Sequence, residues 1–141
     1  MSPRLAINIL LSNMLTVNAR AYSIRNFLTL FLSIEVTRAM MDASNAKERN
    51  DHVAYAFAQQ KVELFTKQLN ESNPLLTRIS DAMTKEGIAR DKLAVADDEE
   101  ESVNWKLVME MESLAKSRAN EELMECNAKY QKLMKELRES H

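Results

Sequence analysis

The sequence predicts an all-α protein, built as a helical hairpin or bundle with a long C-terminal coiled-coil-like helix. Three observations support this fold class. The 141 residues contain one Gly and two Pro, about 2 per cent together against roughly 12 per cent in average proteins. Sheets and barrels need many tight turns and therefore many glycines. Apolar residues recur at helical spacing, and no Gly or Pro follows Gly87.

Composition indicates one folded domain, and the net charge differs between the two ends of the chain. Hydrophobic residues make up 45% of the chain and charged residues 28%, as in ordinary folded proteins. The net charge of −2 is unevenly distributed, because residues 1–41 carry four Arg and one Glu, whereas residues 88–141 carry nine basic and thirteen acidic residues. Such asymmetry of charge indicates a targeting signal or a one-sided interface.

Residues 1–41 form an apolar, basic N-terminal segment that fits either a targeting signal or an anchor. Residues 5–17 and 27–34 are apolar runs, and both are shorter than the ~20 residues that span a bilayer. Polar residues occur at every fourth position around the first run, namely Arg4, Asn8, Ser12, Thr16 and Arg20. Three interpretations stay open: a packed helix, a mitochondrial import signal, or a secretory signal cleaved near Ala19-Arg20-Ala21. Met40 or Met41 could also be the start of translation.

Residues 42–141 are predicted to be a helical, coiled-coil region with one break and one turn. Asn50 and Asp51 are good caps for a helix to about Asn70, with Glu63–Lys67 as a favourable pair on its polar side.

Pro74 and Gly87, which follow that predicted helix, are each expected to interrupt the helical pattern. Pro74 disfavours a helical conformation at the residue before it, and proline is favourable at the first position of a helix. The sequence therefore predicts a break near 72–74, then a short helix over 74–86. Gly87 stands where a helix-ending left-handed residue is expected, which predicts a turn near 87.

The last helix is predicted over 103–137 and would be roughly 50 Å long at about 1.5 Å per residue. Its apolar positions recur at gaps of three or four and form a stripe that is longer than a small chain can cover. We therefore expect partner helices to bind there. The pairs Glu112–Lys116 and Glu125–Lys129 should stabilise it. The expected partner-interface residues are Leu107, Met111, Leu114, Leu123, Cys126, Tyr130, Leu133 and Leu137.

No residue pattern points to catalysis, a cofactor or a metal. The acidic run 97–101 is expected to be the first turn of the last helix, where the macrodipole favours acids. His52 and His141 have no zinc-like spacing to Cys126. Cys126 lies on the apolar stripe, which predicts a buried thiol rather than a nucleophile. The acidic C-terminal region also argues against nucleic-acid binding. We expect the protein not to be an enzyme.

The sequence therefore predicts a non-catalytic protein–protein interaction subunit or scaffold component of a larger assembly. It would act through coiled-coil-type packing with partner helices, in a homo- or hetero-oligomer. The alternative is a membrane-associated protein anchored through residues 5–34. An intracellular location is favoured, with mitochondrial import as the other interpretation.

Overall fold

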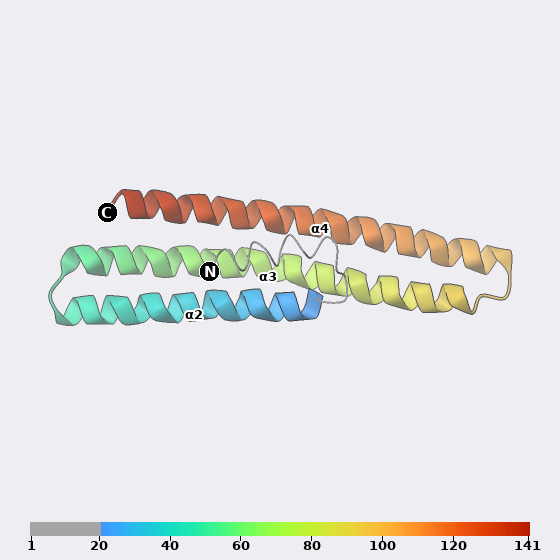
Figure 1. Cartoon of the computed structure of the whole chain (residues 1–141), viewed down its shortest axis with the longest axis horizontal. Coiled ribbons are helices and arrows are strands. Elements are labelled where there is room, and N and C mark those ends of the chain that lie inside the picture. The colour runs from blue at the N-terminus through green and yellow to red at the C-terminus, as the bar shows by residue number, and fades with distance from the viewer. Residues whose placement is uncertain (1–20) are drawn as a thin grey trace. The chain divides into compact units, whose positions relative to one another are not determined.

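The computed structural model describes residues 21–141, with side chains from Phe27 onward. This part of the chain forms three packed helices: α2 (Ala21–Glu48), α3 (His52–Ala94) and α4 (Glu99–Glu139) (Figure 1). The predicted all-α fold class and the long C-terminal helix are confirmed. The polar stripe and apolar run predicted before residue 21 lie outside the described residues, so the targeting interpretations stay predictions.

The chain divides into two compact units, and the boundaries fall inside helices. The three-helix unit contains residues 26–73 and 124–141, from α2, the first part of α3 and the last part of α4. The hairpin unit contains residues 74–123, together with residues 21–25 of the described part of the chain. The boundary expected between residues 41 and 42 falls within α2, which continues to Glu48.

The link between α2 and α3 confirms one of the two predicted caps of α3, Asp51, whereas Asn50 follows the end of α2. Asn50 has a φ of 56°, a left-handed conformation that Asn tolerates better than most residues. The Asp51 N–H donates to the Ala46 carbonyl at 2.9 Å, which satisfies one of the last carbonyls of α2. The Asp51 carboxylate accepts a hydrogen bond from the Ala54 N–H at 3.0 Å. Asp51 is therefore the N-cap of α3.

The acidic run begins α4, as expected. Asp98 Oδ1 accepts a hydrogen bond from the Glu101 N–H at 2.7 Å, which makes Asp98 the N-cap. Glu99, Glu100 and Glu101 form the first turn. Negative charge at this end is stabilised by the partial positive charge of the free backbone N–H groups.

The predicted break near 72–74 and turn near 87 are wrong, because α3 is continuous from His52 to Ala94 with Pro74 inside it. A proline inside a helix costs about 3 kcal/mol through a lost hydrogen bond and a steric clash. The exposed Pro74 lies between buried positions on the same helix, among them Ser72 and Leu76. Burial of apolar side chains by the continuous helix offsets the cost of the proline. Gly87 does not have a positive φ, so it does not end the helix.

The three-helix unit is held by small and large apolar residues on its three helices. Its buried hydrophobic residues are Leu28, Leu32, Ala39, Ala43 and Ala46 on α2, Ala58 and Phe65 on α3, and Cys126, Tyr130 and Met134 on α4. Thr29 Oγ1 donates to Asn73 Oδ1 at 3.2 Å between α2 and α3. Gln68 donates to Asn127 Oδ1 at 3.2 Å between α3 and α4.

In the hairpin unit, the second part of α3 lies beside the first part of α4. Their buried apolar residues include Leu76, Ile79, Ala82, Ala89, Ala119 and Leu123. Lys116 does not follow the expected surface pairing with Glu112. Its Nζ lies 2.9 Å from Oε2 of Glu86 on α3, with only 10% and 12% of the two side chains exposed. The predicted Glu63–Lys67 pair in the other unit is present at 2.9 Å.

Candidate functional site

The eight residues expected at a partner interface do not form one surface. Leu123, Cys126 and Tyr130 are buried within this chain, and Leu133 and Leu137 are half-buried. Only Leu107, Met111 and Leu114 are exposed, and all three belong to the hairpin unit. Helical periodicity identifies apolar positions, but it does not indicate which of them the same chain covers.

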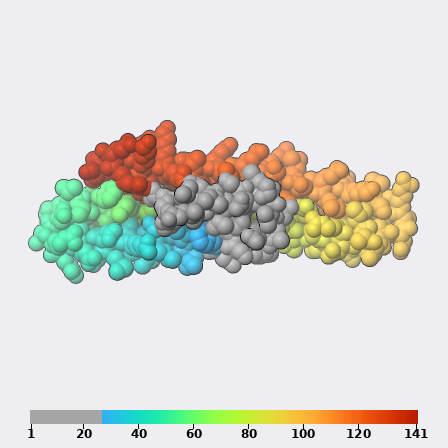
Figure 2. All heavy atoms as spheres, in the orientation of Figure 1, coloured from blue at the N-terminus to red at the C-terminus, as the bar shows by residue number. Residues whose placement is uncertain are grey.

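The exposed residues form a continuous apolar face on α4, which we call the outer stripe. It consists of Val103, Leu107, Met111 and Leu114, with exposed fractions of 56%, 54%, 61% and 52%. Their spacing of four, four and three residues places them on one side of the helix. Val103 is not among the interface residues expected from the sequence, although its four-residue spacing from Leu107 could have identified it. The first half of α4, coloured orange, lies at the molecular surface in Figure 2.

The other side of the same helix segment packs within the chain. Lys116, Ala119 and Asn120 are buried there, and Val108 and Glu112 are half-buried. A helix that is apolar on one stripe normally turns that stripe to its own core. This part of α4 has a covered face and, in addition, an apolar face in water. Such a patch is typical of an interaction site.

Charged residues continue the outer stripe at both of its ends. Glu100 stands three residues before Val103, and Arg118 stands four residues after Leu114, so both lie on the same side of α4. Both side chains are exposed. The outer stripe therefore has an acidic end, next to the run 97–101, and at its other end Arg118 is followed on the same helix side by the exposed Glu121.

A second apolar face lies on α2 in the three-helix unit. Phe27, Leu30, Ile34 and Met41 are exposed there, at gaps of three, four and seven residues, which is the spacing of one helix side. We call this face the α2 stripe. Three of its four residues fall within the segment 5–34 that the sequence singled out as a membrane anchor.

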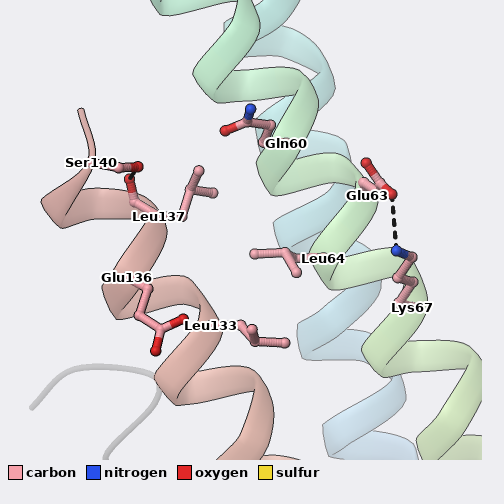
Figure 3. A pocket seen from close by; sticks show the side chains of 8 residues that line it. All are labelled: Gln60, Glu63, Leu64, Lys67, Leu133, Glu136, Leu137 and Ser140. Atoms are coloured by element: carbon pink, nitrogen blue, oxygen red, sulfur yellow. Dashed lines mark hydrogen bonds and ion pairs between the residues drawn. The ribbon is translucent and has the colours of Figure 1, made fainter.

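A shallow groove separates α3 from α4 in the three-helix unit, with a volume of about 450 Å³. Figure 3 shows Leu64 of α3 pointing toward Leu133 and Leu137 of α4 across this groove. Its polar lining includes the Glu63–Lys67 ion pair, drawn as a dashed line. Because Leu133 and Leu137 contribute to this groove, they are separate from the outer stripe.

The single cysteine lies in a hydrogen-bonded cluster between α3 and α4 and is a poor nucleophile. Cys126 Sγ is 3.7 Å from Ser72 Oγ and 3.8 Å from Glu71 Oε2. Burial raises the pKa of the Cys126 thiol, and the adjacent Glu71 carboxylate raises it further. Because the thiolate is the reactive form, this environment suppresses its reactivity. The predicted buried thiol is confirmed.

Glu71 organises the other groups of this cluster. Lys129 Nζ lies 3.2 Å from Glu71 Oε2, so Lys129 reaches across to α3 and does not form the predicted pair with Glu125 on its own helix. A hydrogen bond from Tyr130 is the main cause that lowers the pKa of Glu71, and Lys129 lowers it further. Burial raises the pKa of Tyr130. These contacts stabilise the packing of α3 on α4 and leave Cys126 protonated at neutral pH.

Residues 21–141 contain neither a metal-binding cluster nor a helix that could span a membrane. In residues 21–141, no group of three or more His, Cys, Asp or Glu side chains is placed to hold a metal ion. Within the same range, each helix is too short or too polar to span a membrane.

Comparison with known proteins adds no relative from which a function could be transferred. No protein family, curated protein or solved structure matches the chain. The exposed apolar faces of α4 and α2 are therefore the features from which a function can be argued.

Proposed function

We propose that this protein is a non-catalytic helical interaction subunit of a larger assembly, and that it binds a partner helix through the outer stripe. One observation carries the proposal. Four large apolar side chains line one side of α4 and are each more than half exposed, while the opposite side of that helix is already packed.

The free energy gained by covering this apolar face supports the proposal. Removing a Val, Leu or Met side chain from water is worth about 1.5–3 kcal/mol when it is fully exposed at the start. Side chains that are about half exposed would each contribute roughly half of that. Because the four residues are adjacent on one helix side, a single partner helix could cover them all by side-chain interdigitation.

The outer stripe is tested by affinity purification of tagged full-length protein from its source cells. Leu107→Asp places a charge in the middle of the stripe, so we expect the wild type to retain a partner chain, either another protein or an untagged copy, that the variant loses. Ile88→Asp is the matched control, since Ile88 is 51% exposed on α3 of the same unit. Circular dichroism should show equal helicity for all three proteins. Equal recovery of the same partners with Leu107→Asp would refute the proposal.

A second candidate function is attachment to a membrane surface, and the α2 stripe is the observation that favours it. A helix with an exposed apolar side can lie in the headgroup region of a bilayer, and basic residues strengthen its attraction to anionic lipid. Residues 1–41 carry four Arg and one Glu, so charge and apolar surface coincide in this part of the chain.

Co-sedimentation with vesicles tests the membrane candidate. We expect full-length protein to sediment with phosphatidylcholine–phosphatidylserine vesicles and to be released by Leu30→Asp, because Leu30 is 60% exposed at the centre of the α2 stripe. Val53→Asp, at an exposed position on α3, is the control that should remain bound. Failure of the wild-type protein to sediment would exclude this function for these lipids.

A further inference from the structure

We draw no further inference here: the strongest candidate, the outer stripe of exposed apolar residues on the first part of α4, is an apolar face for which nothing in the structure shows what covers it.

Discussion

Leu123→Ala is expected to lower the free energy of unfolding by about 3 kcal/mol, within the 2–5 kcal/mol typical of such changes in a core. Leu107→Ala, sixteen residues earlier on the same helix, is expected to change it by less than about 0.5 kcal/mol in dilute solution. The reason is burial, because Leu123 is 1% exposed and Leu107 is 54% exposed. Removing three carbons from Leu123 leaves a cavity, whereas at Leu107 it leaves water-filled space.

Urea denaturation at two protein concentrations checks this pair of variants. The effect of Leu123→Ala should be the same at low and high concentration, because its neighbours belong to the same chain. Leu107→Ala should have no measurable effect at either concentration, because the Leu107 side chain is more than half exposed. A concentration-dependent loss with Leu123→Ala would mean that Leu123 acts at a partner interface, as the sequence alone suggested.

Glu86→Gln is expected to lower the free energy of unfolding by about 3 kcal/mol, because removing one member of a buried ion pair leaves the other charge without its partner. The Lys116 ammonium lies 2.9 Å from the Glu86 carboxylate, and both side chains are close to nine-tenths buried. The neutral amide cannot compensate the desolvated ammonium group.

Two comparisons give this prediction its controls. Glu122→Gln removes a charge from the Arg78–Glu122 pair of the same unit, which joins at 3.1 Å but is more than half exposed. Its effect should stay below about 1 kcal/mol. The double variant Glu86→Leu with Lys116→Met should recover most of the stability lost in Glu86→Gln, because it removes both charges. Equal losses for Glu86→Gln and Glu122→Gln, measured by urea unfolding, would contradict a buried role for Glu86.

Local chemistry explains which structural predictions from the sequence succeeded. Asp51 caps α3, because a capping carboxylate accepts a hydrogen bond from the N–H group three residues later. The acidic run supplies the first turn of α4, because negative charge is stabilised at the start of a helix. The Glu63–Lys67 pair is equally local, since residues four apart are neighbours on any helix. The scarcity of Gly and Pro indicated long helices without any knowledge of their partners.

The failures arose where residues distant in sequence decide the outcome. Pro74 and Gly87 are local signals for a helix end, yet α3 passes through both. Lys116 and Lys129 each had an acidic neighbour four residues earlier. In the structure their ammonium groups reach Glu86 and Glu71 on α3 instead. A single sequence does not say which helices pack together, so these pairs could not be predicted.

The sequence by itself determined that the chain is helical, that Asp51 caps one helix and the acidic run starts the last one, and which positions are apolar. These properties depend on spacings within one or two turns. Only the tertiary structure decided how the apolar positions of α4 divide. Leu123, Cys126 and Tyr130 are covered within the chain, whereas the outer stripe remains in water. The physical reason is that periodicity defines the faces of a helix, but the neighbouring helices determine which face is buried.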